Sequence, residues 1–124
     1  ENPGFQLVGV LVYDPEKDGL DAGALCGLPP TTGVRATTDK DVILTSGAQV
    51  VVHAASKAHA VETNAEDICR MLAAGIDVIS TTSYNHLPTY GTATAAAFVD
   101  ACRTGNSRFH AAGENPGFMF ERLV

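Results

Sequence analysis

Five segments of the 124-residue chain have the residue pattern of β-strands, and other elements separate them. Residues 5–13 form a nearly continuous apolar run, which predicts a strand buried on both faces and therefore part of a parallel sheet. Residues 49–53 repeat this pattern in a shorter form. The remaining strand candidates are residues 34–37, 76–80 and 107–112.

Two longer helices are predicted between the last three strands. The first covers residues 63–74, because residues 63–66 have the capping-box pattern and Gly75 can end a helix in the left-handed conformation. Its apolar stripe consists of Ile68, Met71 and Leu72. The second covers residues 92–104, with Gly105 as its stop. The residues expected on its buried face are Ala95, Phe98, Val99 and Cys102.

Shorter elements are predicted around these. Residues 21–25 have room for one or two helical turns, and Thr38 or Asp39 can cap a short helix that runs to Leu44. Residues 84–91 form an irregular segment broken by Pro88.

Strands that alternate with helical patterns favour an α/β fold with a doubly wound parallel sheet, as in Rossmann-like domains. In the strand order 3-2-1-4-5-6, residues 5–13 and 34–37 take places 2 and 3, and the last three strands take places 4 to 6. Strand 1 of this order, and the glycine-rich turn that follows it, are not among these segments. We therefore expect residues 1–124 to be a partial nucleotide-binding domain, in which residues 5–13 and 49–53 do not pair directly.

Composition narrows the function classes. The net charge of −6 argues against a broad surface for nucleic acid or for an anionic membrane, and no apolar run approaches the length of a membrane span. The three cysteines are far apart in the sequence and lack the spacing of metal ligands. These features predict a cytoplasmic protein with reduced thiols and no metal centre.

Candidate binding residues stand where two strands end. His53 is followed by Ala54, Ala55 and Ser56, and Ser80, Thr81 and Thr82 lie in a hydroxyl-rich turn. Because ligands bind at the carboxyl ends of parallel strands, we expect Ala54, Ala55, Ser80, Thr81 and Thr82 to lie together there. Small residues let a flat ring or a phosphate approach the chain, and the hydroxyls can bond a carboxamide. The alternatives are that the hydroxyls only cap the next segment and that His53 is a satisfied, partly buried side chain.

Two other positions carry possible chemistry. Asp14 follows the strand predicted over residues 5–13, and an acid at this place can bind ribose hydroxyls in a dinucleotide fold. A cap of the Asp-Pro turn explains the aspartate equally well. Lys17 can meet a ribose phosphate or simply be solvated. Among the other histidines, His86 in the irregular segment is the best functional candidate.

Four segments together resemble a known family. They are Leu-Val-Gly-Val at 7–10, Lys-Asp-Gly-Leu-Asp-Ala-Gly-Ala-Leu-Cys-Gly at 17–27, Ala-Gly-Ile-Asp-Val-Ile-Ser-Thr-Thr at 74–82, and Ala-Gly-Glu-Asn-Pro-Gly-Phe at 112–118. The chain resembles the amino-terminal nucleotide domain of dihydrodipicolinate reductase-like oxidoreductases, with the diaminopentanoate dehydrogenase type nearest.

The resemblance implies a cofactor, NAD or NADP, and hydride transfer to or from an imine-type carbon of a small, amino-acid-derived substrate. It also implies that residues 53–56 and 80–82 line the cofactor cleft, and that Glu114 and Asn115 contact the cofactor. Residues 114–117 would join this cleft to a substrate domain that lies outside this chain and through which the protein forms a homo-oligomer. We expect the chain alone to turn over no substrate. The alternative is a non-catalytic module that binds a nucleotide or coenzyme A.

Overall fold

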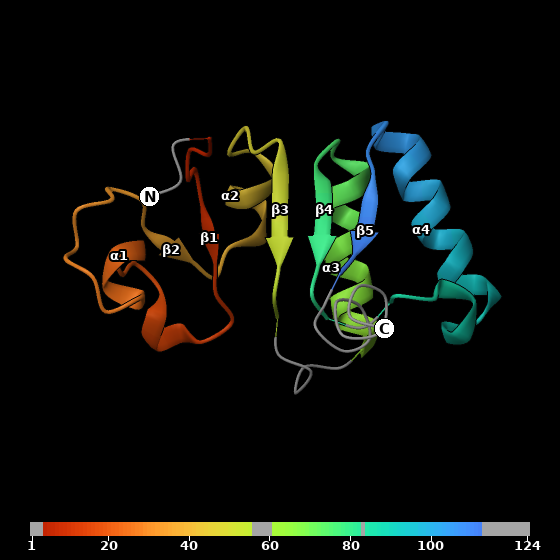
Figure 1. Ribbon diagram of the computed structural model, residues 1–124, viewed down its shortest axis with the longest axis horizontal. Helices are drawn as coiled ribbons and strands as arrows, with labels where there is room; N and C mark the ends of the chain where they lie inside the picture. The colour runs from red at the N-terminus through yellow and green to blue at the C-terminus, as the bar shows by residue number, and fades with distance from the viewer. Residues whose placement is uncertain (1–3, 56–60, 83, 113–124) are drawn as a thin grey trace, which may run out of the picture. The chain divides into compact units, whose positions relative to one another are not determined.

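The computed structural model describes residues 4–55, 61–82 and 84–112, and the chain divides into two compact units, residues 1–48 and 49–124 (Figure 1). Its strands pair in parallel, and helices connect them, so the predicted mixed α/β class with a parallel sheet is confirmed. Each unit holds its own sheet, with the order β1-β2 in the first unit and β3-β4-β5 in the second.

The first unit contains a short parallel pair. β1 (Val10–Leu11) pairs with β2 (Ala36–Thr37), and the Val12 amide extends the ladder by donating to the Thr37 carbonyl at 2.9 Å. The predicted strand over residues 5–13 is therefore too long, and its burial is wrong at Phe5, which is 73% exposed. The physical reason is that β2 offers only two residues for pairing, so the start of the apolar run has no ladder to join in the described part of this unit.

Short helices complete this unit: η1 (Pro15–Lys17), α1 (Ala22–Leu25) and α2 (Lys40–Leu44). Aspartates cap both α-helices, and Asp39 rather than Thr38 caps α2 by accepting from the Asp41 amide at 2.9 Å. Asp21 caps α1 and also accepts from Thr32 Oγ1 at 2.9 Å and the Gly33 amide at 3.0 Å, so one carboxylate fixes the loop between α1 and β2. Although desolvation opposes it, these hydrogen bonds lower the pKa of Asp21.

The second unit is a three-stranded parallel sheet with two helices. β3 (Val50–His53), β4 (Asp77–Ser80) and β5 (Phe109–Ala111) lie side by side in the predicted order. β1 pairs with β2, and β3 pairs with β4. β1 and β3 do not pair with each other, as the predicted strand order requires. The connecting elements are α3 (Val61–Ala73), η2 (Leu87–Tyr90) and α4 (Thr92–Gly105).

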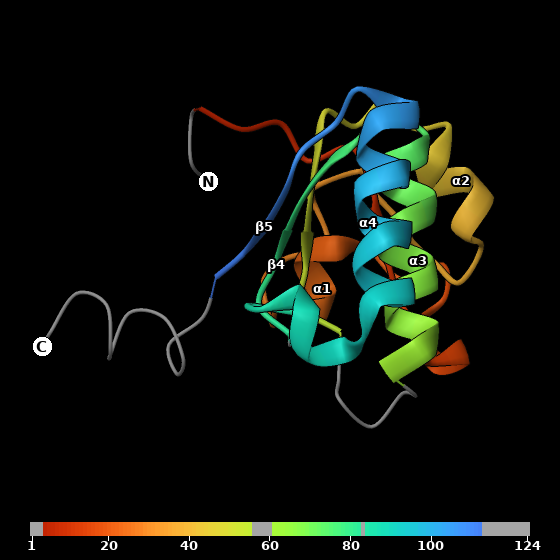
Figure 2. The same ribbon diagram turned by 90° about the vertical axis from the view of Figure 1, so that its right-hand side faces the viewer.

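α3 and α4 both cover the same face of this sheet (Figure 2). Both connections step in one direction, from β3 to β4 to β5, and right-handed crossovers in one direction place their helices on one side. The predicted stripe of Ile68, Met71 and Leu72 is buried there, as is Phe98 of α4, whereas Val99 is 44% exposed and its predicted burial is wrong.

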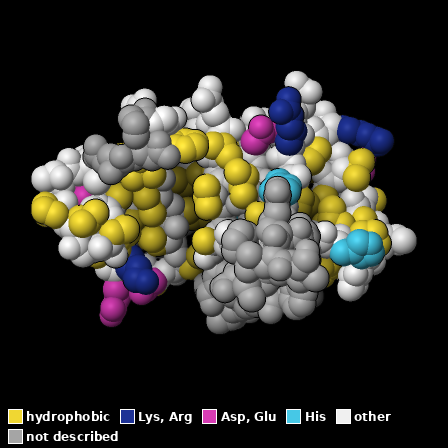
Figure 3. All heavy atoms as spheres, viewed as in Figure 1, with side chains coloured by type: hydrophobic (Ala, Val, Ile, Leu, Met, Phe, Trp, Pro, Cys, Tyr) yellow, Lys and Arg dark blue, Asp and Glu magenta, His cyan; other side chains and the backbone are white. Residues whose placement is uncertain are grey.

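The opposite face of the sheet carries exposed apolar side chains. Val52 is 67% exposed, and Val50 and Ile79 are each 38% exposed, so the prediction of strands buried on both faces is wrong for this face. Figure 3 views the molecule from this side and shows hydrophobic atoms at the surface.

The helix ends differ from the prediction in two places. α3 already begins at Val61, so residues 63–66 lie inside the helix and do not form a capping box. α4 includes Gly105, and Asn106 is the left-handed residue that ends it, with φ 50°. Gly75 ends α3 as predicted, with φ 86°.

Gly105 allows α3 and α4 to approach closely. A Cβ at this position would lie 1.8 Å from the Leu72 carbonyl oxygen, so the two helices can pack in this way only because residue 105 has no side chain.

Candidate functional site at the carboxyl ends of β3 and β4

The two predicted turns leave the sheet side by side. His53 and Ser80 are partners in the parallel register, and the Thr81 amide donates to the His53 carbonyl at 2.9 Å. The structure therefore brings Ala54 and Ala55 to the same end of the sheet as Ser80, Thr81 and Thr82. This is the juxtaposition that the sequence predicts.

Three side chains of these turns form a buried triangle. His53 Nδ1 lies 3.1 Å from Ser80 Oγ and 3.4 Å from Thr82 Oγ1, and the two hydroxyl oxygens are 2.7 Å apart. The exposed fractions are 5% for His53, 0% for Ser80 and 8% for Thr82. Their polar atoms thus bond mainly to one another, and they hold the two strand ends together from the helix side of the sheet.

The surface of this site is made by other residues. Ala54 and Thr81 are exposed, and Ala55 is half-buried. The accessible side chains at this edge of the sheet are thus two alanines and one threonine. The remaining predicted site residues, Ser56, Glu114 and Asn115, lie outside the described residues.

Burial controls the electrostatics of His53. It lowers the pKa of the imidazole, and the Asp67 carboxylate opposes this only in part, so the neutral form is favoured in the folded protein. In the described structure, His53 Nε2 is buried without a hydrogen-bond partner, and Asn64 Oδ1 on α3 is in the same state. Neutral imidazole keeps one ring nitrogen as an acceptor, which suits the hydroxyls of the triangle.

Two buried polar residues of α3 were missed by the sequence reasoning. Asn64 is 4% exposed and Asp67 is 3% exposed, and the Asp67 carboxylate lies close enough to His53 to oppose the effect of burial on the pKa of its imidazole. A signal for them exists in the sequence, because positions 64, 67 and 71 recur at helical spacing on the stripe that continues to Leu72. That stripe is polar at its first turn and apolar further on.

Asp14 has a local structural role in the first unit. Its Oδ1 accepts from the Glu16 amide at 3.0 Å, which caps η1, and its Oδ2 lies 3.8 Å from Lys17 Nζ. The turn-cap alternative is therefore what the structure shows. The carboxylate is 46% exposed, so it remains accessible to a ligand.

In the part of the chain that the structure describes, no three His, Cys, Asp or Glu side chains gather where they could share a metal ion. None of the helices described is long and apolar enough to cross a membrane.

The parallel strands, their alternating helices and the paired turns define part of a Rossmann-like α/β protein. No protein-family model matches the chain. A curated relative, an amine dehydrogenase of Streptomyces virginiae, is 32% identical to it over 94% of the chain. The aligned region is 33% of the relative, so this chain spans about a third of that protein's length and is related to part of an oxidoreductase.

Proposed function

We propose that the chain is part of the nucleotide-binding domain of an NAD- or NADP-dependent dehydrogenase that transfers a hydride between its cofactor and an amine or imine-type carbon. The observation that carries the proposal is the pair of turns at the ends of β3 and β4, with Ala54, Ala55 and Thr81 at the accessible edge. The relationship to a protein named amine dehydrogenase supports the same class of reaction.

The residues of the site suit a flat cofactor ring. Small side chains at Ala54 and Ala55 leave the backbone open to close approach, and the Thr81 hydroxyl can bond a carboxamide. The buried triangle behind them fixes the direction of both turns without using the exposed side chains. A bound nicotinamide supplies the hydride chemistry, and the protein supplies orientation and electrostatics.

Asp14 and Lys17 are the candidate contacts for the adenosine end of the cofactor. The exposed Asp14 carboxylate would bind the adenosine ribose hydroxyls, while Lys17 beside it could meet a ribose phosphate. We further propose that Ser56, Glu114 and Asn115 complete the cleft. A substrate domain outside this chain would bind the small-molecule substrate and make the contacts of a homo-oligomer.

The test is a titration of the 124-residue chain with NADH, followed by nuclear magnetic resonance of the backbone amides. We expect weak binding that shifts Ala54, Ala55 and Thr81 first, and no turnover. Ala54→Glu should remove these shifts, because a carboxylate at an exposed cleft position repels the pyrophosphate and crowds the ring.

Ala97→Glu is the matched control, since Ala97 is also an exposed alanine but lies on α4. Shifts confined to other regions, or unchanged by Ala54→Glu, would count against the proposed function. Binding of coenzyme A in place of NADH would favour the non-catalytic alternative.

A further inference from the structure

The hydrogen bonds of the buried triangle have a defined order. Ser80 Oγ is their centre, since it lies 2.7 Å from Thr82 Oγ1 and 3.1 Å from His53 Nδ1, and the Thr82 amide also donates to it at 3.3 Å. The third side of the triangle, between Thr82 Oγ1 and His53 Nδ1, is the longest contact at 3.4 Å. The three side chains are therefore linked mainly in the order Thr82, Ser80, His53.

Donor counting gives the direction of these bonds. Each hydroxyl carries one hydrogen, and a neutral imidazole can leave Nδ1 as an acceptor. Thr82 then donates to Ser80 Oγ and Ser80 donates to His53 Nδ1, so both hydroxyl hydrogens are used within the triangle. A proton on Nδ1 reverses the bond to Ser80 and turns the Ser80 hydrogen toward Thr82 Oγ1. Thr82 must then point its own hydrogen out of the triangle, because Nδ1 no longer accepts.

Thr81 connects the triangle to the accessible edge of the site. It lies between Ser80 and Thr82 in the chain, its amide donates to the His53 carbonyl at 2.9 Å, and its side chain is exposed. Ala54 directly follows His53 and is exposed as well. A rearrangement of the buried hydroxyls should therefore change the direction of surface residues on both turns.

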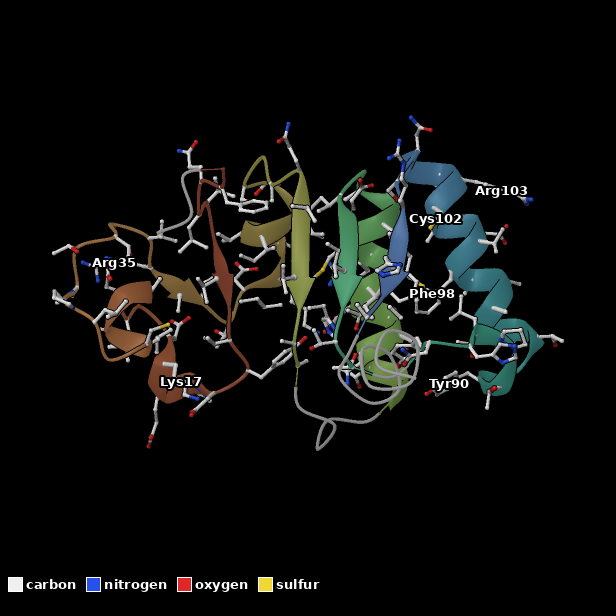
Figure 4. All side chains as sticks on the ribbon, in the orientation of Figure 1. Lys17, Arg35, Tyr90, Phe98, Cys102 and Arg103 are labelled. Carbon is white, nitrogen blue, oxygen red and sulfur yellow. The ribbon has the colours of Figure 1, made fainter. Side chains whose placement is uncertain are left out.

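The charges around His53 favour its neutral form. Among the described residues, the charge that acts on it is the Asp67 carboxylate of α3, and β4 faces it with the uncharged hydroxyls of Ser80 and Thr82. Figure 4 shows Arg103 at the opposite end of α4 from the carboxyl ends of the strands. Burial lowers the pKa of His53, and Asp67 opposes this only in part, so the imidazole is neutral at neutral pH.

We infer that His53 is a positioning residue of the cofactor site, and that the dinucleotide binds only while His53 Nδ1 accepts the hydrogen bond from Ser80. The inference rests on the proposed function for the ligand and on the triangle for the control of its binding. Acidification converts Nδ1 into a donor, turns the Thr82 hydroxyl and displaces Thr81, so the affinity for the cofactor falls. Charge attraction alone has the opposite sign, because an imidazolium attracts the pyrophosphate. The sign of the pH dependence therefore distinguishes positioning from charge attraction.

The first measurement is a pH titration of the unliganded 124-residue chain by nuclear magnetic resonance, between about pH 8 and pH 5. The ring signals of His53 give its protonation, and the backbone amides of Ala54 and Thr81 report on the two turns. We expect both amides to shift with the same midpoint as the His53 ring, while the other amides keep the positions of a folded chain. Amides of Ala54 and Thr81 that stay fixed over this range overturn the inference.

The second measurement is the affinity for NAD⁺ at each pH. It should fall by up to about tenfold per pH unit below the midpoint of His53. His53→Asn is the conservative variant, because its carbonyl oxygen can accept from Ser80 near the place of Nδ1 but cannot be protonated. It should bind NAD⁺ with nearly the parent affinity at pH 8 and lose the pH dependence. His53→Ala lacks the acceptor and should bind at least about tenfold more weakly at every pH.

His110→Asn is the matched control, since His110 is an exposed histidine of β5, and this variant should keep the pH dependence of the parent. If His53→Ala does not fold, Thr82→Val, which removes one hydroxyl and keeps the shape of the side chain, should still weaken NAD⁺ binding at pH 8 by at least about threefold.

The outcomes separate this inference from the proposed function. An NAD⁺ affinity that is constant over the range, or that rises in acid, overturns the positioning role of His53 and leaves the proposed function standing. No NAD⁺ binding at any pH counts against the proposed function, and the amides of Ala54 and Thr81 then still decide whether His53 controls the turns.

Discussion

Replacement of Gly105 by alanine should disrupt the packing of α3 against α4. An alanine Cβ at this position would lie 1.8 Å from the Leu72 carbonyl oxygen and 2.7 Å from the Gly75 amide nitrogen, whereas ordinary contact begins at 3.4 Å. The same carbonyl accepts hydrogen bonds from the Gly75 amide at 3.0 Å and from Ser107 Oγ at 2.7 Å. The Cβ cannot enter without separating the helix ends and breaking or lengthening both bonds.

The magnitude follows from these contacts. Overpacking costs about 1–3 kcal/mol and each of the two hydrogen bonds about 1 kcal/mol, while alanine regains about 1 kcal/mol of helix propensity. The free energy of unfolding should therefore fall by about 2–4 kcal/mol. In urea this corresponds to a midpoint lower by about 1–2 M.

Urea denaturation followed by circular dichroism measures this change. Thr104→Ala, at the exposed neighbouring position of α4, should change the stability by less than about 0.5 kcal/mol. Gly27→Ala has no atom within 4 Å of the new Cβ but a φ of 71°, so it should cost only about 1–2 kcal/mol of backbone strain. A Gly105→Ala variant as stable as Thr104→Ala would refute the close approach of the two helices.

Two further predictions concern titratable side chains. Because burial lowers the pKa of His53 in the folded protein, the unfolded chain binds a proton at this imidazole more tightly than the folded chain does. The free energy of unfolding should therefore be highest above about pH 6.5 and fall below it, and His53→Gln should reduce the slope of Tm against pH in this range. Equal slopes for the parent and the variant would contradict this. Burial, and to a smaller extent the Cys102 thiol, raise the pKa of Cys69, so an aromatic disulfide reagent should modify the exposed Cys26 at least about tenfold faster than Cys69. Mass mapping of the modified cysteines measures the two rates, and the reverse order would show that the assigned environments are wrong.

The sequence by itself determined the elements whose signals are local. Runs of β-branched residues identified β3 and β4, and the spacing of Ile68, Met71 and Leu72 identified the buried stripe of α3. Since parallel strands share the direction of their carboxyl ends, the order of strands along the chain was also enough to bring Ala54 and Thr81 to one edge.

Only the tertiary structure decided which of these residues a ligand can reach. Whether Ser80 and Thr82 face a cleft or the helices depends on how the register of β3 and β4 turns them toward His53, a contact across 27 residues or more. The close approach of α3 and α4 at Gly105 could not be predicted for the same reason, because it depends on a distance between segments that are far apart in the sequence. Local patterns specify which face of an element is apolar, whereas the approach of two backbones is set by the packing of all the side chains between them.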